Sequence, residues 1–166
     1  TVPGSKTWGN NIPRIVTWGR FADSATGREL YVFNTHFDHQ SQPSREKSAA
    51  LLARRLAQRE PLRPVLVTGD FNAAEDNPAI KFLKGETADS PIWLLDTFRL
   101  VHPDAQEVGT FHAFQGGTSG GKIDYVFIES GGKVVRADIL HDCENGKYPS
   151  DHYPVMAEVE WPVVSN

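Results

Sequence analysis

Four apolar segments of this sequence carry Asp, Asn or His at or near one end, where such groups cost energy unless something satisfies them. The segments are NTHF with His36, GDFN with Asp70 and Asn72, KIDYVF with Asp124, and SDHYPV with Asp151 and His152. Carboxylates, amides and imidazoles bind metals, position phosphates and transfer protons. The pattern therefore predicts a chemical site assembled at one edge of a sheet.

Alternation of side chains along a strand predicts which residues share a face with these groups. In each of the first three segments the shared face is apolar at one end and polar at the other. The predicted faces are Leu30, Val32, Asn34 and His36; Leu66, Thr68, Asp70 and Asn72; and Asp124, Val126 and Ile128.

The elements that must position these groups follow from local patterns, after an irregular lead-in over residues 1–13. Residues 14–23 and 28–39 read as a hairpin with a turn at Ser24–Gly27. Ser44 is predicted to cap a helix that runs to about Arg59, and Asp76 or Asn77 to cap a short helix that has Pro78 at its first position. Further strands are expected at 63–72, 94–97, 122–129, 134–141 and 154–161, with a flexible loop over 116–121.

Each motif alone also has a purely structural interpretation. His36 could be a hydrogen-bonded structural histidine, GDFN could be an Asx-turn, Asp124 could accept hydrogen bonds from the loop before it, and SDH could cap a strand. A serine-hydrolase interpretation of Ser150, Asp151 and His152 fails, because sequence neighbours cannot form the required relay and no nucleophile elbow is present. Taken together and in this order, the motifs favour a site.

In this order, NTHF, GDFN, KIDYVF and SDHYPV resemble the downstream motifs of the endonuclease/exonuclease/phosphatase superfamily. The resemblance extends from about Arg14 to Trp161, and in style it is nearest to bacterial phosphatase-like members. It implies an α+β fold, a four-layer α/β/β/α sandwich of two packed sheets. This chain is expected to cover mainly the C-terminal half of that fold, either as a single domain over 1–166 or as part of one.

The resemblance also implies roles for individual residues. His152 resembles the general base, and Asp124 the carboxylate that supports its imidazole. Asp70 and Asn72 resemble the pair that positions the attacking water and the phosphate, and His36 a group that contacts the phosphate. Asp151 and Asp70 are the metal carboxylates expected from the resemblance, with Mg²⁺ or Mn²⁺ as the cofactor.

Two family features are absent from the sequence. Members carry an Asn near the first strand and a metal-binding Glu in a Leu-Gln-Glu-like motif in their first half, and the only Gln-Glu pair here, Gln106-Glu107, lies in a polar loop. The chain begins at Thr1 rather than at a methionine, and we expect that Thr1 is not the natural start. We therefore expect an N-terminal half of the domain, in cis or in trans, as a partner.

Elementary electrostatics agrees with a metal-dependent site. Two carboxylates 4 Å apart repel by roughly 4 kcal/mol at an effective dielectric constant of 20, so a cluster of them accepts a phosphate only with a cation between. Oxygen ligands without a thiolate cluster favour Mg²⁺ or Mn²⁺ over zinc. The sequence thus predicts a phosphoesterase that hydrolyses a phosphomonoester or a phosphodiester with a water activated by a His-Asp pair.

Bulk properties separate the competing functions. A net charge of −4 and the lack of a basic, aromatic-laced surface give no strong nucleic-acid footprint, which leaves a Mg²⁺-dependent nuclease as the alternative. The missing Glu favours another alternative, an incomplete family-like fragment or binding module. No apolar run reaches the ~20 residues of a membrane span, and the single Cys143 excludes an internal disulfide, so localisation is left open.

Overall fold

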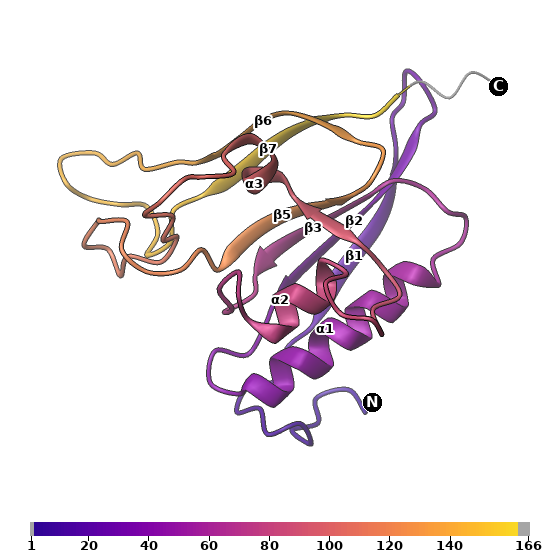
Figure 1. Ribbon diagram of the computed structural model, residues 1–166, viewed down its shortest axis with the longest axis horizontal. Coiled ribbons are helices and arrows are strands. Elements are labelled where there is room, and N and C mark those ends of the chain that lie inside the picture. Colours follow the sequence, from indigo (N-terminus) through magenta and orange to yellow (C-terminus); the bar gives the residue numbers. More distant parts are fainter. Residues whose placement is uncertain (1, 163–166) are drawn as a thin grey trace.

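The computed structural model describes residues 2–162, and its strands form two sheets (Figure 1). The larger sheet has the strand order β1-β2-β3-β5-β4, and β6 pairs with β7. All pairs are antiparallel except β2 with β3. In chain order the elements are β1 (Val16–Ala22), β2 (Glu29–His36), α1 (Gln42–Ala57), β3 (Val65–Asp70), α2 (Pro78–Leu83), β4 (Leu94–Asp96), α3 (Thr97–Val101), β5 (Asp124–Glu129), β6 (Lys133–Ile139) and β7 (Val155–Glu160).

The main core lies between the larger sheet and the helices α1 and α2, which cover one face of it (Figure 1). The apolar stripe of α1 is buried there, with Ala49, Leu52, Ala53 and Leu56, and the sheet contributes large side chains from its three central strands. The core residues of these strands are Tyr31, Phe33, Val65, Val67, Tyr125 and Phe127. The β6–β7 sheet and α3 lie on the other side of β5, so that the α+β class is confirmed.

The second face of the larger sheet is covered only in part. Ile128 of β5, the strand that contacts β7, is completely buried, whereas Leu66 and Val126 are half-buried and Phe21 of β1 is 57% exposed. Strand alternation divides the residues of β3 and β5 between two faces, a first set with Val65 and Val67 and a second set with Leu66 and Val126. The structure places the second set on this face, which we call the open face.

Several element boundaries differ from the predictions. Ser41, not Ser44, caps α1: its hydroxyl accepts a hydrogen bond from the Ser44 N–H, and Pro43 fits the first turn because no intrahelical donor is needed there. Asn77 caps α2, in line with one of the two predicted positions. The strand predicted over 94–97 ends at Asp96, whose carboxylate caps the unpredicted helix α3.

Among the described residues, no helix combines the length and the apolarity that are needed to cross a bilayer.

Candidate active site

Strand pairing brings three of the predicted site residues to one edge of the larger sheet. β2 ends at His36 and the parallel β3 ends at Asp70, and these two residues are paired in register. The antiparallel β5 begins at Asp124, which pairs with Asp70 from the other side. The side chains of this row lie on the open face, away from α1 and α2.

His152 joins this row from the loop before β7. Its Nδ1 lies 2.8 Å from Oδ2 of Asp124, and its Nε2 lies 3.9 Å from Oδ2 of Asp70. The contact with Asp124 is a hydrogen bond, whereas the distance to Asp70 is too long for one. One ring nitrogen is therefore held by Asp124, and the other faces Asp70 across a gap.

The Asp70 carboxylate is the centre of the cluster. Its Oδ1 accepts a 2.7 Å hydrogen bond from the Asn72 N–H, and its Oδ2 accepts a 3.2 Å bond from the Asn72 side-chain amide. Nε2 of His36 lies 3.2 Å from the same Oδ2. Asn72 also donates to the carbonyl of Phe37, so it ties the ends of β2 and β3 together.

The backbone conformation of the GDFN segment explains why it contains a glycine at Gly69 and an asparagine at Asn72. A Cβ on Gly69 would lie 1.9 Å from the carbonyl oxygen of Thr35 in the neighbouring strand, at a φ of +147°. Asn72 has φ 47°, in the left-handed region that Asn tolerates better than most residues. Asn72 thus lies past the end of β3, so the strand predicted over 63–72 ends at Asp70, and the Asn72 amide reaches Asp70 from the turn that follows.

The carboxylates set the protonation of His152. Burial opposes its protonation, but the hydrogen bond and charge of Asp124, with the charges of Asp70 and Asp151, outweigh burial and hold the pKa of His152 above its usual value. At acid pH the ring is an imidazolium paired with Asp124.

Asp70 and His36 are shifted toward their neutral forms. Burial, with the charge of Asp124, raises the pKa of Asp70, while the Asn72 N–H and the two histidines oppose the rise. Burial is the main cause that lowers the pKa of His36; the charges of Arg14 and His152 add to it, and Asp70 opposes it. A neutral His36 can donate a hydrogen bond from one ring nitrogen.

Asp70, Asp124 and His152 could hold a metal ion, since each offers one ligand atom and these atoms lie within 4.8 Å of one another. The donor set fits a divalent cation, because the proximity of Asp124 makes ionised Asp70 costly until a positive charge is added. Asp151 is not in this group, and its Oδ1 lies 3.4 Å from the Ser150 hydroxyl. A metal role for Asp151 stays a prediction.

Two residues that sequence reasoning missed support the cluster. The buried Thr110 accepts hydrogen bonds on Oγ1 from the N–H groups of Ile123 and Asp124, at 3.1 and 3.2 Å. Phe111 pairs with His152 in an isolated β-bridge, with their ring centroids 5.0 Å apart. A single bridge leaves no alternating pattern in the sequence, so neither residue carried a signal.

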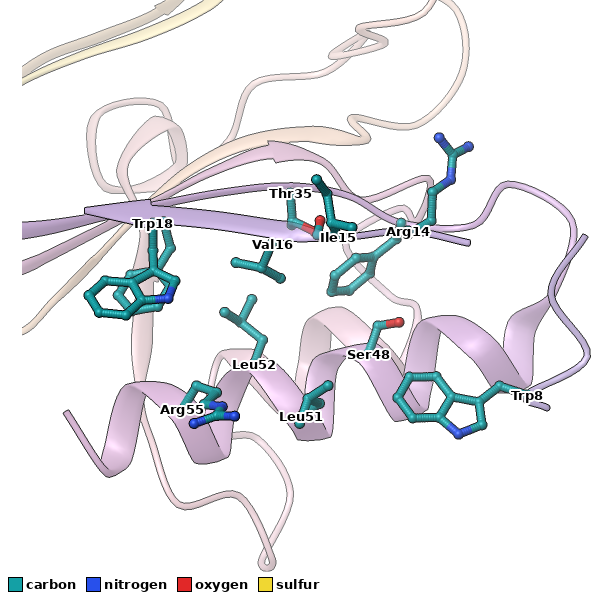
Figure 2. Close-up of a pocket in the computed structure, with 12 residues that line it drawn as sticks. Trp8, Arg14, Ile15, Val16, Trp18, Thr35, Ser48, Leu51, Leu52 and Arg55 are labelled. Carbon is teal, nitrogen blue, oxygen red and sulfur yellow. The ribbon is translucent and has the colours of Figure 1, made fainter. Parts of the chain in front are cut away.

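A cavity of about 480 Å³ lies outside this cluster, between β1 and α1 (Figure 2). Its lining includes Trp8, Trp18 and Leu51, with Arg14 and Arg55 among its polar members. None of the predicted site residues lines it. The site therefore belongs to the sheet edge and not to this cavity.

A sheet edge that carries two carboxylates, an Asn and two histidines, in a mixed α/β fold with two sheets, defines a candidate hydrolase site. The sequence matches the Endonuclease/Exonuclease/phosphatase family over residues 2–152. The chain belongs to this family, and the resemblance read from the four motifs is confirmed. A search of curated proteins gave no match.

Solved structures with the same fold include bacterial and human proteins. A mannosyl-6-phosphatase from Bacteroides thetaiotaomicron VPI-5482 is 29% identical with a TM-score of 0.80, over 95% of this chain and 61% of that one. A family protein from Bacteroides vulgatus is 28% identical with a TM-score of 0.77, over 93% and 58%. The human Nocturnin catalytic domain, 18% identical with a TM-score of 0.70 over 90% and 54%, shares the fold. The chain thus spans about three fifths of the bacterial structures.

Proposed function

We propose that this chain carries the catalytic edge of a metal-dependent phosphoesterase. The observation that supports this most directly is the contact of His152 with Asp124 through Nδ1 while Nε2 faces Asp70 at 3.9 Å. A ring oriented by a carboxylate on one nitrogen and open on the other has the geometry of a general base.

A divalent cation, Mg²⁺ or Mn²⁺, would be held by Asp70 with Asp124 beside it, and Asp151 is the further metal carboxylate that the family resemblance implies. When bound, the metal polarises a phosphoryl oxygen and stabilises charge on the leaving oxygen.

The chain's own residues supply the proton transfer. A water between Nε2 of His152 and Asp70 gives its proton to Nε2 while its oxygen forms a bond to phosphorus and the bond to the leaving oxygen breaks. Asp124 accepts the Nδ1–H and stabilises the imidazolium that results. Asn72 orients Asp70, and His36, whose Nε2 lies 3.2 Å from the same carboxylate, is the phosphate-contacting group that the family resemblance implies.

A phosphomonoester is the favoured substrate class. The similarity to the mannosyl-6-phosphatase extends over 95% of this chain, and the name of that protein states that it removes a phosphate from a sugar. A net charge of −4 speaks against tight binding of long nucleic acid by charge. Hydrolysis of a phosphodiester or of a nucleic acid is the alternative outcome of the test.

An N-terminal portion of the domain is proposed as the partner of this chain, in cis or in trans. The chain lacks the family's metal-binding Glu motif and spans about three fifths of the bacterial structures. Its open face leaves Leu66 and Val126 only half-buried, as a missing second layer would. That portion would complete both the metal site and the sandwich.

The test is hydrolysis of a panel of a sugar phosphate, an aryl phosphate, a phosphodiester and single-stranded DNA with Mg²⁺. The 166-residue chain is assayed alone and with the portion encoded upstream of it. We expect phosphomonoester hydrolysis that requires Mg²⁺, the upstream portion and His152, and that His39→Ala leaves unchanged because His39 is exposed and outside the cluster. Absence of metal-dependent hydrolysis in both forms would sink the proposed function, and full activity of the chain alone would sink the proposed partner.

A further inference from the structure

Arg14 lies at the same edge of the sheet as the catalytic row. It stands two residues before β1, and Val16, the first residue of β1, pairs with Thr35 near the end of β2. Because β1 runs antiparallel to β2, the start of β1 lies beside the end of β2, where His36 is located. The edge therefore continues from Asp124 through Asp70 and His36 to Arg14.

The Arg14 side chain points to the face of the sheet that carries the site. Figure 2 shows Val16 and Leu52 facing each other between the sheet and α1, while the Arg14 guanidinium points away from α1. His36 and Asp70 also lie on the face away from α1, since their neighbours Phe33 and Val67 are in the core beneath the helix.

No group of the described residues satisfies Arg14. Its Nε is buried without a hydrogen-bond partner, and within residues 2–162 no carboxylate lies within ion-pair distance of the guanidinium. By contrast, Arg59 pairs with Glu129, and Arg99 with Glu75. A buried, unpaired guanidinium nitrogen beside a phosphate site indicates an anionic ligand.

We propose that Arg14 is a further substrate-binding residue, whose guanidinium takes a non-bridging oxygen of the substrate phosphate on the His36 side of the site. The inference rests on the phosphoesterase function proposed above and names a residue and a preference that this function does not require.

The position of Arg14 also favours one charge state of substrate. Asp70 and Asp124 would hold the metal at one end of the row, where it would neutralise charge, and Arg14 adds a fixed positive charge at the other end. A phosphomonoester dianion has a third non-bridging oxygen that a diester lacks, and a guanidinium fork binds two such oxygens at once. Arg14 is thus expected to strengthen binding of monoesters more than that of diesters.

The experiment uses whichever form hydrolyses phosphoesters in the reconstitution above, the chain alone or with the upstream portion. Arg14→Ala, Arg14→Lys and Arg55→Ala are compared with the wild type. Arg55 is the matched control, because it is exposed and lines the same cavity from α1 (Figure 2). KM, kcat and competitive inhibition by inorganic phosphate are measured for an aryl phosphate and for its methyl diester, with thermal unfolding as a check on folding.

We expect Arg14→Ala to raise the KM for the monoester and the inhibition constant of phosphate about 10- to 100-fold, as loss of one charge-assisted hydrogen bond predicts, with kcat nearly unchanged. For the diester, Arg14→Ala should raise KM by a smaller factor. The KM of Arg14→Lys for the monoester should lie between those of Arg14→Ala and the wild type, and the KM of Arg55→Ala should equal that of the wild type. Equal KM values in Arg14→Ala and Arg55→Ala would overturn the inference and leave the proposed function intact.

If no form hydrolyses any phosphoester, the proposed function fails, and Arg14 is judged by calorimetric binding of inorganic phosphate in the presence of Mg²⁺. Binding that Arg14→Ala weakens and Arg55→Ala preserves would support the anion site. Equal binding by the two variants, or none by the wild type, would overturn it.

Discussion

Nδ1 of His152 lies 2.8 Å from Oδ2 of Asp124, while Nε2 of the same ring lies 3.9 Å from Oδ2 of Asp70. The two carboxylates therefore act differently on one imidazole. Asp124 fixes the ring through a hydrogen bond, and Asp70 faces the free nitrogen across a distance that no direct hydrogen bond spans. A water that contacts both Nε2 and Asp70 would lie where a nucleophile is needed.

Replacing Asp124 by Asn is predicted to lower turnover with little change in substrate binding. The amide keeps the shape of the side chain but loses the charge that stabilises the imidazolium, and because it can turn its NH2 toward Nδ1 it no longer fixes the tautomer. General-base catalysis contributes about 10²- to 10⁴-fold, and we expect a loss of kcat within this range. The measurement is steady-state kinetics on the reconstituted enzyme, with Asp142→Asn, an exposed acid, as the control.

An unchanged kcat in Asp124→Asn would remove Asp124 from the mechanism. A raised KM with normal kcat would instead place Asp124 in substrate binding.

The pH profile provides a second prediction about the same pair. His152 acts as a base only when neutral, and its pKa lies above the usual value, so activity should fall on the acid side beginning above the ordinary histidine pKa of ~6.5. Removal of the Asp124 charge lowers the pKa of His152, so the acid limb of Asp124→Asn should move to lower pH. Rate measurements at saturating Mg²⁺ over a series of pH values would show this, and identical acid limbs in the two proteins would contradict it.

The raised pKa of His152 also makes the stability of the fold depend on pH. Because folding raises the pKa of His152, its contribution to stability is fully present below the pKa of the unfolded state and is lost as pH rises through the folded value. Asp124→Asn should therefore destabilise the fold more at acid pH than at alkaline pH. The free energy of unfolding in urea, measured at both pH values, separates this effect from catalysis.

Much of the site could be predicted from the sequence because strand alternation has a fixed period. Alternation fixes which face of its own strand carries Asp70 or Asp124, and the antiparallel pairing of β3 with β5 then places both residues on one face of the sheet. Asn72 could not be placed this way, because its positive φ ends β3 at Asp70. Its link to Asp70 depends on a turn rather than on a strand.

The other features that could not be predicted from the sequence also depend on contacts between residues that are distant in the chain. α3 is five residues long, too short for a periodic pattern, and it depends on the Asp96 cap and on contact with β5 and β6. Thr110 is linked to Asp124 by hydrogen bonds across a loop, which no local pattern reveals. Arg14 precedes β1 by two residues, and only the antiparallel pairing of β1 with β2 brings it beside His36.

Substitutions at Asn72 can separate its amide from its backbone conformation. Asn72→Ala and Asn72→Gly both remove the hydrogen bonds to Asp70 and Phe37, but only glycine adopts the 47° φ without cost. We expect the alanine variant to be less stable than the glycine variant by about 1 kcal/mol. Both should lose activity, because Asp70 is no longer oriented. Urea unfolding and kinetics test this; equal stability of the two variants would show that the backbone is not strained, and normal activity in both would show that the amide is dispensable.

The open face yields the last prediction, which concerns the 166-residue chain by itself. Phe21 is 57% exposed, and Leu66 and Val126 are half-buried on the same face, with β6 and β7 covering only the part over Ile128. An apolar sheet face that is only partly covered marks an interaction site. The chain alone should therefore self-associate, and the upstream portion should replace this contact with a 1:1 complex.

Sedimentation velocity over a range of concentrations measures this association. Phe21→Ser with Leu66→Thr should weaken it, whereas Leu62→Ser should not, because Leu62 is 68% exposed but lies in the turn between α1 and β3. Adding the upstream portion to the wild-type chain should give one species of the summed mass and raise Mg²⁺-dependent hydrolysis in the same titration. If the isolated chain is monomeric at every concentration, the open face is tolerated in water and is not the surface that the second layer covers.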